Sequence, residues 1–149
     1  MRRPVIERFR ADRGNSIVEF SLISFMFIIL LLGVVEMGRM ILVYTTIANA
    51  ARAGTRYAIV HGSDQTVSPS GPGSPCTCTQ VQTVVQNFAS AGLVNTSLLT
   101  TTVNYPDNSN SPGSRVSVTV SYPYDPLVRY FTSLLSDSLS STSPGVITY

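Results

Sequence analysis

The chain has 149 residues, of which 44% are hydrophobic and 12% are charged, and its net charge is +2. This length predicts one folded domain. The positive charge belongs to the first 14 residues, which carry five arginines and two acids, whereas the rest carries five arginines and six acids. The rest therefore lacks the concentrated basic surface that nucleic-acid-binding proteins use.

One long apolar run dominates the N-terminal part of the chain. Residues 20–35 contain no charged side chain, and with their apolar flanks they reach about 20 residues, the length that a helix needs to cross a bilayer. A buried core helix is the alternative, but the remaining chain is too small to surround a helix that is apolar on all sides. The preceding arginines predict a cytoplasmic N-terminus and an extracytoplasmic C-terminal part. We therefore expect a single-pass protein of the cytoplasmic (inner) membrane, in contact with lipid.

A cleaved secretory signal peptide is a second explanation for this N-terminus. The small-residue sequence that signal peptidase would need, Ala48 to Ala50, lies about 13 residues beyond Val35. That distance is too long for a signal peptide, in which the cleavage site follows the apolar region closely. The apolar run is therefore expected to stay in the mature protein.

A patterned stretch follows the run, from Glu36 to Val60, with no proline between Gly14 and Val60. Its spacing of three and four predicts an amphipathic helix that continues the membrane helix, about 65–70 Å in total. The helix is expected to end at His61, with Gly62 as its C-cap. The apolar stripe consists of Met37, Met40, Ile41, Tyr44, Ile47, Ala48, Ala51, Tyr57, Ala58 and Ile59.

Residues 62–149 predict a small α+β domain. A Gly-, Ser- and Pro-rich loop comes first, followed by a helix near residues 80–92 whose apolar positions are Val81, Val84, Val85 and Phe88. Residues 100–105 and 115–124 predict strands joined by a turn-rich connection, and the second strand is expected to place Val116, Val118, Val120 and Tyr122 on one face. Residues 125–135 predict a short helix or an irregular packed segment. Residues 138–149 predict a last strand, in which Pro144 favours an edge position or a bulge.

The expected fold is thus a membrane-anchored α+β protein with one helix on a three-stranded antiparallel sheet. Its predicted segments are 1–14, a basic leader; 15–35, the transmembrane helix; 36–61, the amphipathic continuation; and 62–149, the extracytoplasmic domain.

Residues with catalytic or metal-binding chemistry are scarce. Cys76 and Cys78 predict a local disulfide outside the cytoplasm, with free or intermolecular thiols, or a metal or redox role, as alternatives. His61 is the only histidine, and its expected position at a helix end favours a capping or surface role. We therefore expect no enzyme activity, no cofactor and no metal site.

Glu19 lies at the mouth of the apolar run, in the sequence RGNSIVEF. A carboxylate inside hydrocarbon costs several kcal/mol, so such residues usually have a partner. The alternative is that Glu19 lies at the headgroup level, where its charge costs little. Gly14, five residues before it, has no side chain that would obstruct a peptidase acting on the backbone.

This sequence resembles the processing site of type IV-like prepilins, with Gly14, Glu19 and Phe20 in the corresponding places. The resemblance implies cleavage between Gly14 and Asn15 by a prepilin peptidase, which would make the new amine of Asn15 a partner for Glu19. Glu19 and Phe20 would then be determinants of assembly.

The longer stretch through NAARAGTRYA resembles the TadE-like family of the tight-adherence (Flp) pilus systems. The residues that carry this resemblance are Glu36, Gly38, Arg39, Asn49, Arg52, Gly54, Arg56 and Tyr57. It implies a pilin-like fold and a minor pilin or pseudopilin that assists assembly of a type IV-like pilus. The implied partners are the prepilin peptidase, the major Flp pilin, other minor pilins and the inner-membrane assembly platform. The alternative is an uncleaved single-pass protein whose outer domain binds a partner or the cell envelope.

Overall fold

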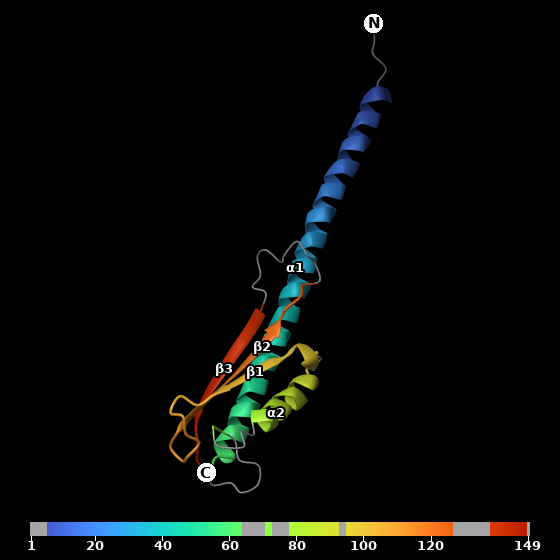
Figure 1. Cartoon of the computed structure of the whole chain (residues 1–149). Helices are drawn as coiled ribbons and strands as arrows, with labels where there is room; N and C mark the ends of the chain where they lie inside the picture. Colours follow the sequence, from blue (N-terminus) through green and yellow to red (C-terminus); the bar gives the residue numbers. More distant parts are fainter. Residues whose placement is uncertain (1–5, 64–70, 73–77, 93–94, 127–137, 149) are drawn as a thin grey trace. The chain divides into compact units, whose positions relative to one another are not determined.

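The structure is a computed structural model, and it describes residues 6–63, 71–72, 78–92, 95–126 and 138–148 (Figure 1). The chain consists of two compact units, Met1–Gly38 and Arg39–Tyr149. The elements in chain order are helix α1 (Ile6–Val60), helix α2 (Cys78–Ser90), the short 3-10 helix η1 (Thr96–Leu98), and strands β1 (Thr100–Asn104), β2 (Arg115–Pro123) and β3 (Ser138–Val146). The predicted α+β architecture is confirmed, including the long apolar N-terminal helix.

The three strands form one antiparallel sheet in the order β1-β2-β3, so β2 is central and β3 is an edge strand. Val118 of β2 pairs with Val103 on one side and with Ser143 on the other. The predicted edge position of Pro144 is confirmed, and it suits a residue that has no backbone N–H to donate.

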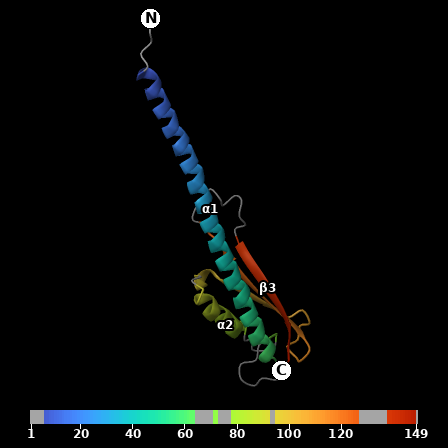
Figure 2. The same ribbon diagram turned by 180° about the vertical axis from the view of Figure 1, so that it is seen from behind.

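The hydrophobic core lies between one face of this sheet and two helices, α2 and the part of α1 that follows Gly38. In Figure 1 the strands lie in front of this part of α1, and in Figure 2, the view from the opposite side, α1 lies in front of the strands. The predicted alternation along β2 is confirmed, because every second side chain is buried against the helices. The fully buried residues are Ile47, Ala50, Ala51, Ala58, Val81, Val85, Ala89, Val116, Val118, Val120 and Ile147.

Two glycines allow α1 to approach its neighbours closely. A Cβ atom added to Gly54 would lie 2.6 Å from the Cγ2 atom of Val85, and one added to Gly145 would lie 2.6 Å from the Cδ1 atom of Ile59. Thr55, which is buried between these contacts, places its hydroxyl 2.9 Å from the carbonyl oxygen of Ser143. Gly54 on α1 therefore allows close contact with α2, and Gly145 on β3 allows close contact between α1 and the edge of the sheet.

Several positions that were predicted to belong to the buried stripes are wrong, because their side chains are exposed. Phe88 is 46% exposed, and the buried stripe of α2 instead consists of Val81, Val85 and Ala89 at intervals of four. On α1, the stripe residues Met37, Ile41 and Tyr44 are 64%, 56% and 48% exposed, whereas Met40 between them is half-buried. Helical spacing identified the stripe but not where along the helix the covering layer begins.

Helix α1 ends after Val60, as expected, but its end is capped differently. The predicted cap residue, Gly62, does not have the positive φ that a left-handed cap requires; among the described residues only Gly71, Gly113 and Asn108 have one. Instead, the His61 side chain places Nδ1 3.0 Å from the carbonyl oxygen of Tyr57, and its ring stacks on the Tyr57 ring at 4.0 Å. The backbone N–H of Thr148 also donates to the carbonyl oxygen of Ile59, at 3.1 Å, so the residues after β3 contribute to satisfying this end of the helix.

The connection between β1 and β2 is held by an ion pair. Asp107 accepts the backbone N–H of Arg115 at 2.8 Å and the guanidinium nitrogen Nη2 at 2.7 Å. The hydrogen bond from the Arg115 side chain, followed by the one from its backbone, lowers the pKa of Asp107 from 3.8 to about 2. The segment predicted at 125–135 lies outside the described residues from Leu127 onward, as does most of the loop after Ser63.

A pH titration of stability checks this ion pair. Because the carboxyl pKa is lower in the folded state, its contribution to stability is present above about pH 4 and is lost as the pH falls through about 2. We expect the unfolding temperature of the natural chain to fall more steeply between pH 4 and pH 2 than that of Asp107→Asn. The measurement is thermal unfolding followed by circular dichroism, with Asp125→Asn as the control for the loss of one carboxylate. Parallel pH curves for the natural chain and Asp107→Asn would contradict the assignment.

Candidate functional site on helix α1

The first candidate site is the N-terminal part of α1. Helical structure is continuous through Gly14, so the predicted scissile bond between Gly14 and Asn15 lies within a helix. All four of its predicted residues, Gly14, Asn15, Glu19 and Phe20, are exposed, and Phe20 is 73% exposed. Since Asn15 and Glu19 are four residues apart, they lie on one face of the helix, one turn from each other.

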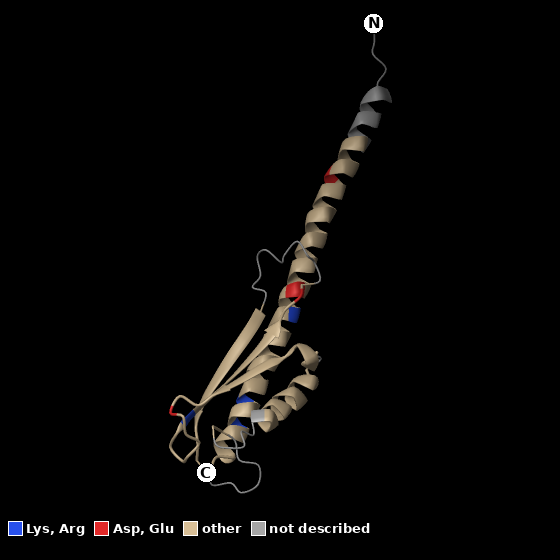
Figure 3. Ribbon diagram, in the orientation of Figure 1, with Lys and Arg blue, Asp and Glu red and all other residues tan. Residues whose placement is uncertain are grey.

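Exposed apolar side chains surround Glu19 on α1. The side chains from Ile17 to Val35 that are large and hydrophobic are between 45% and 73% exposed. Figure 3 shows how few charged residues this part of α1 carries. Among the described residues, α1 is the one helix that is long and apolar enough to cross a membrane, with a mean hydropathy of 2.6 in its candidate window.

The length of this surface matches a bilayer. The residues from Ile17 to Met37 rise about 31 Å along a helix, close to the roughly 30 Å thickness of a hydrocarbon core. Glu19 is near one end of this span and Glu36 is near the other. The two carboxylates therefore lie where the apolar stretch begins and ends.

The second set of candidate residues lies on the C-terminal half of α1, and the structure separates it into two groups. Gly54 and Tyr57 serve packing: Gly54 contacts Val85, and the Tyr57 hydroxyl donates to Oε1 of Gln80 at 2.6 Å. These two residues join α1 to α2. Their role in the fold follows from contacts between segments that are far apart in the sequence.

Asn49, Arg52 and Arg56 form the other group, and all three are exposed on α1. The Arg52 guanidinium donates to Oδ1 of Asn49 at 3.3 Å, which holds these two side chains along the helix surface. The spacing of three and four places the group on one face, so it is available to a partner rather than to the core.

Near the start of the second unit, Arg39 lies over the ring of Tyr124, with 5.1 Å between the guanidinium carbon and the ring centroid. Tyr124 is 5% exposed, so Arg39 makes a cation–π contact with a buried aromatic ring. Gly38 has open space around its Cα, and Glu36 is 5% exposed. The predicted motif residues therefore have different surroundings and do not form one site.

The predicted disulfide lies outside the described residues, because neither Cys76 nor the side chain of Cys78 is described. Within the part of the chain that is described, no three His, Cys, Asp or Glu side chains gather as metal ligands. Sequence reasoning missed Thr55 and Gly145, which tie β3 to α1. No sequence signal marks them, since their partners are more than 80 residues away.

Residues 14–56 match the family model described as TadE-like protein. The resemblance expected from the sequence is thereby confirmed over this segment, which contains Gly14, Glu19 and most of the motif residues. The match relates the segment to proteins of pilus assembly. No curated protein and no solved structure matches the chain.

Proposed function

We infer, from the TadE-like match over residues 14–56, that the chain is a minor pilin or pseudopilin that assists assembly of a Flp-type, type IV-like pilus. The observation that carries this proposal is the exposed apolar surface of α1 with Glu19 at its start. A soluble protein would bury such a surface, whereas a pilin subunit holds it first in lipid and then against other subunits.

Cleavage after Gly14 is the first step of the proposed function. The basic leader stays on the cytoplasmic side, where a prepilin peptidase reaches Gly14, and the folded unit lies outside the cytoplasm. Because glycine has no side chain, its backbone can enter a narrow active site. The product begins with the amine of Asn15.

The new amine gives Glu19 a partner of opposite charge. In the isolated subunit the amine lies one helical turn from the carboxylate, and in an assembly the carboxylate of one subunit pairs with the amine of the next. Pairing removes the cost of holding single charges near hydrocarbon and sets the register between subunits. The proposed partners are the major Flp pilin, other minor pilins and the inner-membrane assembly platform.

The N-terminus of the mature protein tests this proposal. We expect intact mass and N-terminal sequencing of the protein from its own host to give a start at Asn15. A start at Met1 would contradict it. The chain would then be an uncleaved single-pass protein whose outer unit binds a partner or the envelope.

Replacing Gly14 with leucine should leave the leader attached, because the added side chain obstructs the peptidase. Gly33→Leu is the matched control, since Gly33 lies in the same helix and also has open space around it. We expect Gly33→Leu to be cleaved like the natural chain. The measurement is the ratio of uncleaved to cleaved protein on an immunoblot, and equal cleavage of both variants would contradict the assignment.

A further inference from the structure

The face of the sheet that points away from the helices is covered with hydroxyl groups. Because side chains alternate along a strand, the residues between the buried valines of β2 point outward, and so do their partners on β1 and β3. The outward residues that pair across β1, β2 and β3 form three rows. These rows are Thr100, Ser121 and Ser140; Thr102, Thr119 and Thr142; and Asn104, Ser117 and Pro144. None of these nine side chains is ionisable.

The rows form a regular grid of donors and acceptors. Cross-strand neighbours on one face lie about 5 Å apart, and successive rows lie about 7 Å apart along the strands. The hydroxyl oxygens of Thr119 and Thr142 are 2.8 Å from each other, which shows that adjacent strands bring these groups into hydrogen-bonding contact.

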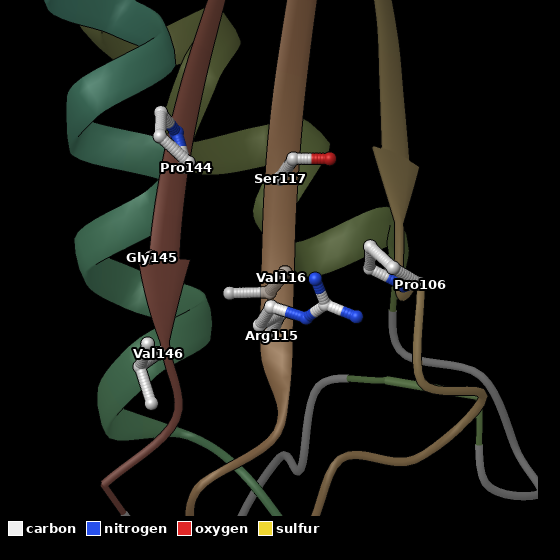
Figure 4. A pocket seen from close by; sticks show the side chains of 7 residues that line it. All are labelled: Pro106, Arg115, Val116, Ser117, Pro144, Gly145 and Val146. Atoms are coloured by element: carbon white, nitrogen blue, oxygen red, sulfur yellow. The ribbon is translucent and has the colours of Figure 1, made fainter.

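An open hollow of about 470 Å³ lies at one end of this grid, within the range of pockets that hold small ligands. Figure 4 shows the residues that line it, which come from the start of β2, the end of β3 and the connection between β1 and β2, where Pro106 lies. Pro106, Pro144 and Val146 provide apolar walls, and Val146 is 51% exposed. Ser117 and Arg115 contribute the polar groups.

Arg115 is held in place at the edge of the hollow. Its guanidinium donates to both carboxylate oxygens of Asp107, at 2.7 Å from Nη2 and 3.2 Å from Nε. These two contacts compensate the charge of the guanidinium and use only two of its five N–H donors. The group is thus a fixed, charge-compensated donor beside an apolar surface.

We propose that this face of the sheet binds a neutral saccharide chain, with one pyranose ring in the hollow. A pyranose ring has an apolar C–H face, which suits the walls formed by Pro106, Pro144 and Val146. Its hydroxyls accept hydrogen bonds from Arg115 and exchange them with Ser117. Further sugar units extend over the rows that contain Thr119 and Thr142.

The chemistry of the face argues against other occupants. An anionic polymer needs cations that are not already compensated, and the one cation here is paired with Asp107. A protein partner needs an apolar centre larger than the hollow, but the rows beyond it carry only hydroxyl and amide groups. An uncharged polyol matches both parts of the face, the apolar hollow and the hydroxyl grid.

Isothermal titration calorimetry of the full chain in lipid nanodiscs tests the proposal, with the neutral hexasaccharides cellohexaose, maltohexaose and hexa-N-acetylchitohexaose as probes. We expect at least one of these hexasaccharides to bind with a Kd between about 0.1 and 10 mM, as suits a shallow and open site. The absence of binding by all three would overturn the proposal, whatever the result for leader cleavage or pilus assembly.

Two variants locate the binding. Val146→Asp places a charge on the wall of the hollow and is expected to raise the Kd about tenfold, because the apolar contact is lost and the carboxylate must be desolvated. Pro144→Ser, which removes one apolar wall of the hollow without adding a charge, is expected to raise the Kd by a smaller factor. Val60→Asp is the matched control, since Val60 is 47% exposed on α1.

Thermal unfolding measured on each variant shows that it is folded before its affinity is compared. Binding that is weakened by Val146→Asp and Pro144→Ser but unchanged in Val60→Asp supports the proposal. Equal affinity in the natural chain and in both hollow variants would overturn it.

Discussion

Glu19→Ala is expected to reduce pilus assembly strongly while leaving cleavage after Gly14 intact. The carboxylate is exposed at the start of the apolar surface and lies one turn from the amine that cleavage would create. Losing a charge pair at the edge of hydrocarbon costs a few kcal/mol, and each 1.4 kcal/mol changes an equilibrium about tenfold. We therefore expect assembly to fall about tenfold or more. The measurement is the number of pili per cell by electron microscopy, in a host that has only the variant copy.

A matched control and an isosteric variant sharpen this experiment. Ser21→Ala removes a polar group from the same span, but that hydroxyl is already bonded to the carbonyl oxygen of Val18 within the helix. We expect Ser21→Ala to assemble normally. Glu19→Gln keeps the size of the side chain and removes its charge, so it should behave like Glu19→Ala. A normal number of pili in either Glu19 variant would contradict the charge-pair role.

Gly54→Leu is expected to produce the largest loss of stability. The position has no room even for a methyl group, because a Cβ atom would lie 2.6 Å from Val85 and 3.3 Å from Val118. Overpacking of this kind costs about 3 kcal/mol or more when helix, helix and sheet meet at one point. For a unit of this size, the unfolding temperature should fall by roughly 10–20 °C.

Gly38→Leu is the control for the Gly54 experiment, since it makes the same exchange at a helix position with nothing within 4 Å. It gains the same helix propensity and creates no contact, so its unfolding temperature should stay within a few degrees of the natural value. The pair Gly54→Ala and Val85→Ala provides a second check. Because Val85 is the nearest obstacle, the double variant should be more stable than the sum of the single effects predicts. Strict additivity would contradict the close-approach explanation.

Local patterns predicted most of the fold. The apolar run predicted α1, the alternation of Val116, Val118 and Val120 predicted a strand, and Pro144 favoured an edge position or a bulge. Each of these signals depends on neighbours along the chain and on their contact with water or lipid. Helical spacing also predicted a buried stripe on α2, but it placed Phe88 inside, where the structure has Ala89. Spacing alone does not distinguish two adjacent positions at the border of a stripe.

By itself, the sequence determined that the chain has a helix long and apolar enough to cross a membrane, with a carboxylate near its start and a glycine five residues earlier, and that an α+β unit follows this helix. These features follow from periodicity, length and charge, which act locally. Only the tertiary structure decided that Gly54 and Gly145 permit close approach, and that threonines from separate strands meet beside an apolar hollow. The physical reason is that these contacts join residues far apart in the chain, whose distance depends on how whole elements pack.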